Sequence, residues 1–116
     1  KTLKTMFEED DVKQLTQAVE LSLHNKNGSP FFAEKATPLL QAIYSVILPL
    51  KAQDLLFNPE GTRIEKFDFD AFMRWTDLVS LKLLYFTIKE SNEKGQLCRT
   101  EYNDVSYTPV DLSVLT

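Results

Sequence analysis

Apolar residues recur at the spacing of an α-helix over residues 8–24. One face of such a helix carries Val12, Leu15, Val19 and Leu23. Charged and amide side chains fill the opposite face, and the Asn and Gly residues of 25–28 provide a stop. The pattern predicts an amphipathic helix on a core, with the acidic cluster 8–11 at its N-terminal end, where negative charge favours the helix dipole.

A second helical stretch is apolar on nearly all sides. Ser29 and Pro30 suit the N-cap and the first helical position, so the helix is expected to begin there and to reach about Leu50. Pro38 and Pro49 fall inside it. Because each proline removes a backbone donor, a kink or a restart is expected at either residue. A helix of this composition is predicted to be central in the fold.

The segment 51–66 is irregular and contains a strong turn signal. Asn58, Pro59 and Gly61 match a type I turn. The apolar residues on both sides allow either a small β-hairpin over about 55–65 or a loop that closes over the core. The two alternatives remain open from the sequence.

Two further helices are predicted after this turn. Asp68 or Asp70 is placed to cap a short helix over 68–76, and Asp77 is placed to cap a longer one over 77–90. The longer helix is again apolar over most of its circumference. It resembles the second helical stretch in this respect, and the same central position is predicted for it.

These elements predict an all-α fold, a compact helical bundle of about four to six helices in one domain over residues 1–116. The two most apolar helices, one through Ile43 and one through Leu84, are expected to lie against each other as a central pair. The remaining helices would pack outside them. Residues 96–107 are polar and lack helical periodicity, so they are interpreted as an exposed connection.

Composition is that of an ordinary globular domain, with 43% hydrophobic and 26% charged residues among 116. The net charge is −4 and the basic residues are scattered. Direct DNA binding by this segment is therefore disfavoured, because phosphate contacts need a basic surface. The longest uncharged apolar stretch, between Lys35 and Lys51, falls short of the ~20 residues that span a bilayer, so no membrane contact is expected.

No catalytic constellation is recognised in the sequence. Cys98 and His24 are the only residues of their types and lie far apart, which disfavours a Cys–His nucleophile pair and the usual zinc ligand sets. His24 is interpreted as a favourable charge at a helix C-terminus. The three glycines are widely separated and no Gly-Lys-Ser/Thr sequence occurs. We therefore predict that this segment is not an enzyme and holds no catalytic residue, metal or cofactor.

Two stretches carry a family resemblance. Residues 29–42, SPFFAEKATPLLQA, resemble the helix opening in the all-α domain of type IV coupling proteins, the inner-membrane ATPases that bring substrates to conjugation and type IV secretion machines. FDFD at 67–70 and WTDLVSL at 75–81 look most like the plasmid-conjugation and Dot/Icm-type branch of that family. The resemblance covers roughly residues 29–90.

The resemblance implies a segment inserted into a larger RecA-like motor ATPase, after its phosphate-binding loop. ATP and Mg are then expected only in the parent motor, which is expected to be a homo-oligomer. The implied role is a substrate-recruiting lobe at the cytoplasmic face of the bacterial inner membrane, with secretion substrates, relaxosome proteins, effectors or adaptors as partners. The alternative is a free-standing helical adaptor or chaperone-like protein-interaction module.

The family offers no short recognition motif in this segment, so contact residues are predicted from expected exposure alone. Irregular surface segments commonly carry recognition, which favours the turn 58–63 and the connection 96–107. The residues predicted to contact a protein partner are Asn58, Glu60, Arg63, Arg99 and Glu101.

Overall fold

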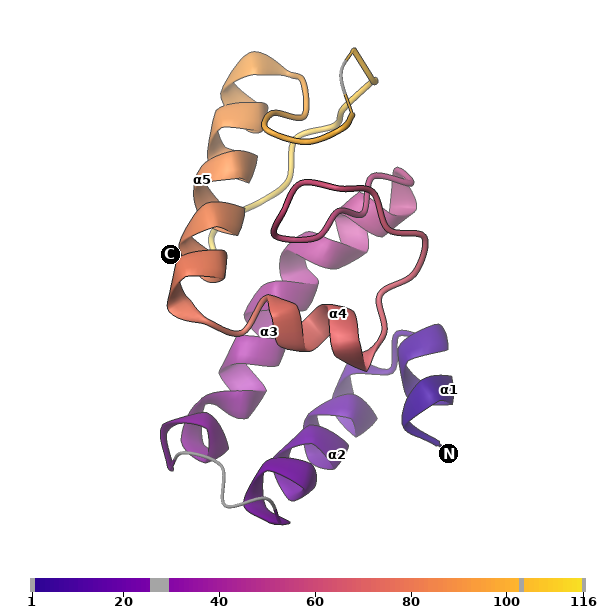
Figure 1. The fold of residues 1–116 in the computed structure, drawn as a ribbon, viewed down its shortest axis with the longest axis vertical. Coiled ribbons are helices and arrows are strands. Elements are labelled where there is room, and N and C mark those ends of the chain that lie inside the picture. Colours follow the sequence, from indigo (N-terminus) through magenta and orange to yellow (C-terminus); the bar gives the residue numbers. More distant parts are fainter. Residues whose placement is uncertain (1, 26–29, 103, 116) are drawn as a thin grey trace.

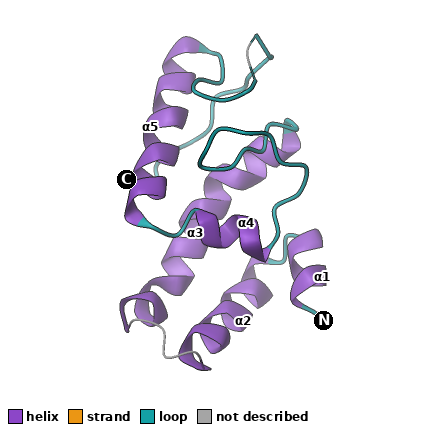
Figure 2. Cartoon of the chain, viewed as in Figure 1, coloured by secondary structure: helices purple, strands orange, loops and turns teal. Residues whose placement is uncertain are grey.

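The computed structural model describes residues 2–25, 30–102 and 104–115, without the side chains of Leu3 and residues 19–37. Within these residues the elements are α1 (Leu3–Glu8), α2 (Val12–Asn25), α3 (Pro30–Ala52), α4 (Phe69–Arg74) and α5 (Leu78–Lys94) (Figure 1). Loops join the helices, and the described residues form no strand (Figure 2). The predicted all-α fold class and the predicted number of helices are confirmed.

The central helix is α3, which runs through the middle of the molecule beside α2 (Figure 1). Its buried side chains are Leu40, Ile43, Tyr44, Val46, Ile47 and Leu50. α3 continues through both Pro38 and Pro49, so neither proline restarts the helix. A proline inside a helix costs about 3 kcal/mol, whereas each large buried side chain contributes roughly 1.5–3 kcal/mol, so the apolar face outweighs both prolines. Ser29, the predicted N-cap, lies outside the described residues.

Two helices precede α3 where one was predicted. The helix expected over 8–24 begins only at Val12, and α1 is an additional element. Between them Asp10 adopts a φ of 54°, and the carboxylate of Asp11 accepts a hydrogen bond of 3.2 Å from the N–H of Gln14. The acidic cluster therefore spans the junction of α1 and α2. Glu8 ends α1, and only Asp10 and Asp11 have the predicted place before the start of the next helix.

The predicted starts of α4 and α5 are confirmed by their caps, whereas α4 ends two residues earlier than predicted and α5 four residues later. The carboxylate of Asp68 accepts a 2.9 Å hydrogen bond from the N–H of Ala71, so Asp68 rather than Asp70 caps α4. Asp77 accepts a 2.8 Å hydrogen bond from the N–H of Ser80 at the start of α5. α5 ends at Gly95, whose φ of 69° is the left-handed conformation that favours glycine.

The expected pairing of the two apolar helices was wrong. Ile43 of α3 and Leu84 of α5 are both fully buried, yet α3 packs most extensively against α2 among the described elements. α5 lies at the edge of the molecule (Figure 1), and its side chains Leu78, Val79 and Phe86 are exposed. An apolar composition on most sides of α5 therefore does not reflect burial on most sides.

The turn predicted near residue 58 is present. The N–H of Gly61 donates a 2.8 Å hydrogen bond to the carbonyl of Asn58, and one isolated antiparallel bridge joins Phe57 to Arg63. Leu55, Leu56 and Phe57 are buried. The segment is thus a loop that closes over the core and contains a hairpin-like turn with a single bridge.

Residues 96–107 are not the exposed connection that their polar composition suggested. Leu97, Tyr102 and Tyr107 are buried, and a second isolated antiparallel bridge joins Gln96 to Ser106. The aromatic residues anchor the segment to the core, while Arg99, Glu101, Asp104 and Ser106 are exposed. None of the helices in the described ranges combines the length and apolar content that a bilayer span requires.

Candidate docking surfaces

The five predicted contact residues lie on two segments that the fold brings together. The N–H of Glu101 donates a 3.0 Å hydrogen bond to the carbonyl of Gly61, and its carboxylate accepts one of 3.0 Å from the N–H of Arg63. Below them, the hydroxyl of Tyr102 donates a 2.7 Å hydrogen bond to the carbonyl of Leu56. We call residues 58–63 and 99–102 the loop clasp.

Most charges of the loop clasp already have a partner within the chain. Arg63 pairs with Asp54 at 3.1 Å, and its guanidinium lies 5.9 Å from the ring centroid of Tyr102. Burial raises the pKa of the Tyr102 hydroxyl, which the positive charge of Arg63 partly offsets. The phenol therefore remains a hydrogen-bond donor at neutral pH. Arg63 holds the clasp together as much as it offers a contact to a partner.

The remaining predicted residues are engaged in a similar way. Glu60 forms an ion pair with Arg74 of α4, and Arg99 pairs with Glu90 of α5 at 3.4 Å. The side chain of Asn58 accepts a hydrogen bond from the backbone within its own turn. These pairs are exposed, and exposed ion pairs contribute about 0–1 kcal/mol, so a bound protein would displace them at little cost.

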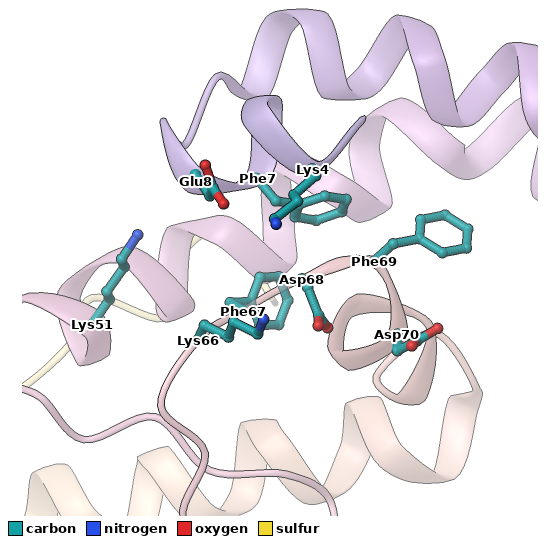
Figure 3. Close-up of a pocket in the computed structure, with 9 residues that line it drawn as sticks. All are labelled: Lys4, Phe7, Glu8, Lys51, Lys66, Phe67, Asp68, Phe69 and Asp70. Carbon is teal, nitrogen blue, oxygen red and sulfur yellow. The ribbon is translucent and has the colours of Figure 1, made fainter. Parts of the chain in front are cut away.

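A cavity of about 280 Å³ lies between α1 and the segment that enters α4 (Figure 3). Its floor is aromatic: the rings of Phe67 and Phe69 each lie 6.3 Å from that of Phe7, in edge-to-face geometry. Its rim carries charges of both signs, from Lys4, Glu8, Lys51, Lys66, Asp68 and Asp70. We call this cavity the aromatic cup. The aromatic cup was not predicted from the sequence, because its lining comes from segments about 60 positions apart.

The charges around the aromatic cup are partly neutralised. Lys51 pairs with Asp10 at 2.8 Å, and Asp68 is used in capping α4. Behind the floor, Tyr44 packs edge-to-face on Phe67, and burial followed by the negative charge of Asp10 raises the pKa of its hydroxyl. The cup is just below the usual size of a small-molecule pocket, and its apolar floor suits a single apolar side chain of a partner.

A third surface is formed by exposed apolar side chains of α5. Leu78 is 67% exposed, Val79 78% and Phe86 52%, with Phe86 about two helical turns after the other two. Large exposed apolar groups on one helix commonly mark a site of protein interaction. We call these three residues the apolar face of α5. The sequence predicted a helix here that is apolar over most of its circumference, but it predicted that this helix is central in the fold.

Among the described residues, no cluster of three or more His, Cys, Asp or Glu side chains is arranged to hold a metal ion. Cys98 is half-buried, with its sulfur 3.2 Å from the carbonyl of Gln96. The side chain of His24 lies outside the described residues, so its predicted role at the end of α2 stays a prediction. The surfaces that are present are suited to binding.

Comparison with known proteins assigns no family to these surfaces. The chain matches no protein-family model, no curated protein and no solved structure at a significant level.

Proposed function

We propose that this chain is a protein-docking lobe, and specifically the substrate-recruiting all-α lobe of a type IV coupling ATPase. The observation that carries the docking role is the apolar face of α5, where Leu78, Val79 and Phe86 are each more than half exposed. Burying such side chains against a partner contributes roughly 1.5–3 kcal/mol each, which is enough to drive association.

The assignment to a coupling ATPase is supported by the resemblance of residues 29–42 and 67–81 to that family. The second of these stretches runs through α4 into the start of α5, and therefore includes Leu78 and Val79. In this proposal secretion substrates, relaxosome proteins, effectors or adaptors bind the lobe, while ATP and Mg bind in the parent motor. The parent is then a homo-oligomer at the cytoplasmic face of the bacterial inner membrane.

The gene that encodes this chain provides the first test. The proposal requires a Walker A sequence upstream of residue 1 and a Walker B strand downstream of residue 116. A gene that encodes these helices without a motor domain would contradict the coupling-ATPase assignment. It would instead favour the alternative, a free-standing helical adaptor or chaperone-like module.

The second test separates docking from motor activity in the parent protein. Leu78→Ser with Phe86→Ser removes much of the apolar face of α5 without touching the core. We expect substrate transfer to fall at least tenfold while ATP hydrolysis is unchanged. Met73→Ser, at an exposed apolar position on α4, is the matched control and should transfer normally. Normal transfer by the double variant would contradict a docking role for this face.

A further inference from the structure

The apolar face of α5 continues into a groove between α5 and α3. The groove has a volume of about 500 Å³. Its apolar lining includes Leu39, Ala42, Leu78, Leu81, Tyr85 and Val114. Residues from three parts of the chain thus form one elongated apolar surface, which we call the α3–α5 groove.

Two lysines lie on α5 at this groove and just beyond it. Lys82 lines the groove, whereas Lys89 lies seven residues further along the same helix, about 10 Å away along the axis, and lines the adjoining hollow with Val79 and Phe86. Both side chains are exposed, and neither forms an ion pair with any side chain that the structure describes. Of the two acids that line the adjoining hollow, Glu90 pairs with Lys94 at 3.0 Å and with Arg99 at 3.4 Å, and Glu93 lies four residues after Lys89 without an ion pair to a described side chain.

We propose that the α3–α5 groove binds an amphipathic α-helix of a partner protein, with acidic residues two helical turns apart that pair with Lys82 and Lys89. An apolar groove accepts the apolar face of a helix at positions i, i+3, i+4 and i+7. Acidic residues seven positions apart on that helix have the same axial spacing as the two lysines. The apolar contacts supply affinity, and the two ion pairs fix the register and exclude basic helices.

A second copy of this chain is a poor occupant of the groove. Its acidic cluster, 8–11, spans the break between α1 and α2 and cannot present two acids along one continuous helix. Within that cluster Asp10 pairs with Lys51, and Asp11 accepts a hydrogen bond from Gln14. The acidic helix is therefore expected to come from a different protein.

This inference rests on the proposed docking function and names the chemistry of the partner. The probe is a synthetic helical peptide of about 18 residues, or five turns, with Leu on one face and two Glu seven positions apart beside it. A control peptide carries Lys in place of the two Glu. We expect the Glu peptide to bind this chain about tenfold more tightly than the Lys peptide, as two exposed ion pairs allow.

A charge exchange then tests the pairing itself. Lys82→Glu with Lys89→Glu should weaken the binding of the Glu peptide about tenfold and strengthen the binding of the Lys peptide by a similar factor. Leu78→Ser should weaken the binding of both peptides, whereas Met73→Ser should leave the binding of both unchanged. An unchanged circular dichroism melt confirms that each variant is folded. Equal affinity for the two peptides, or a preference that the exchange does not reverse, would overturn the proposal.

Two further outcomes would assign the groove to another occupant. If the chain self-associates in sedimentation experiments and the Glu peptide does not dissociate the oligomer, the groove is assigned to a second copy. If anionic vesicles bind and the peptides do not, the groove is assigned to a lipid surface. If the variant with Lys82→Glu and Lys89→Glu retains substrates as well as the unmodified chain does, this inference is overturned and the docking function stays in place. Peptide binding as predicted, with no substrate retained by the unmodified chain, would instead contradict the proposed function.

Discussion

The hydroxyl of Tyr107 donates a 2.6 Å hydrogen bond to the side-chain carbonyl of Asn92, fifteen residues earlier on α5. The same oxygen of Asn92 accepts a 2.9 Å hydrogen bond from the N–H of Val110, and its amide nitrogen donates one of 2.7 Å to the carbonyl of Val110. One side chain thus fastens the C-terminal segment to α5. This attachment holds the end of the chain near the α3–α5 groove, which Val114 helps to line.

The Tyr107 contact predicts a loss of stability at alkaline pH. Burial raises the pKa of Tyr107 to about 12, against 10.0 for an unperturbed tyrosine. The unfolded chain therefore loses this proton first, so the stabilisation is complete below about pH 10 and is lost as the pH rises toward about 12. The free energy of unfolding should fall by about 1.4 kcal/mol per pH unit for such a group.

Urea denaturation at several pH values in this range measures the effect. Tyr107→Phe should be less stable at neutral pH, because the acceptor on Asn92 loses one donor, and its stability should depend less on pH. A residual slope of the free energy of unfolding against pH is expected in the variant, since burial also raises the pKa of Tyr44 and Tyr102. Identical slopes in the variant and the unmodified chain would show that Tyr107 does not titrate as its burial implies.

Gly61 is predicted to be required where Gly95 is not. Both have positive φ, 87° and 69°, but a Cβ on Gly61 would lie 2.8 Å from the carbonyl oxygen of Arg99, whereas a Cβ on Gly95 would meet no atom within 4 Å. Gly95→Ala should cost about 1 kcal/mol from backbone strain alone. Gly61→Ala should cost clearly more, because the loop clasp must open to relieve the clash. Equal losses in thermal denaturation would contradict the close contact across the clasp.

The free energy of unfolding should be sensitive to the truncation of core side chains at two positions on different helices. Ile43→Ala on α3 and Leu84→Ala on α5 each remove a fully buried side chain and should cost about 2–5 kcal/mol. Leu48→Ala, at an exposed position on α3, is the control and should cost much less. Chemical denaturation measures all three. A loss below about 1 kcal/mol at either core position would mean that the helix carrying it is not anchored there.

Charge reversal in the loop clasp tests whether it also contacts a partner. Glu60→Lys with Arg63→Glu should weaken pull-down of a secretion substrate and leave the thermal melt nearly unchanged, because the pairs with Arg74 and Asp54 are exposed. Lys13→Glu with Gln17→Lys changes charge on the exposed side of α2 and serves as the control. An unaltered pull-down would restrict the clasp to a structural role.

Local signals in the sequence were sufficient for most helices. The caps Asp68 and Asp77 and the turn at Asn58 each follow from the chemistry of one or two residues. The α1–α2 junction was missed because it depends on a tertiary contact. Asp10 adopts its positive φ where Lys51, 41 positions away, can pair with its carboxylate.

Candidate surfaces were harder to predict because hydrophobicity does not distinguish core from interface. Phe86 and Leu84 are both apolar and lie two residues apart on α5, yet one is half exposed and the other fully buried. Which side of α5 faces the core is decided by the position of α3 and of the C-terminal segment. Similarly, Tyr102 makes the segment 96–107 part of the core through a hydrogen bond to Leu56, which no local pattern indicates.

Co-purification with defined partners tests the docking proposal most directly. The chain is immobilised and offered purified secretion substrates, relaxosome proteins and adaptors encoded by the same transfer system, beside Leu78→Ser with Phe86→Ser and the Met73→Ser control. We predict that the unmodified chain and the control retain at least one of these proteins and that the double variant retains it at least tenfold less. Retention of none by the unmodified chain, or equal retention by the double variant, would contradict the account.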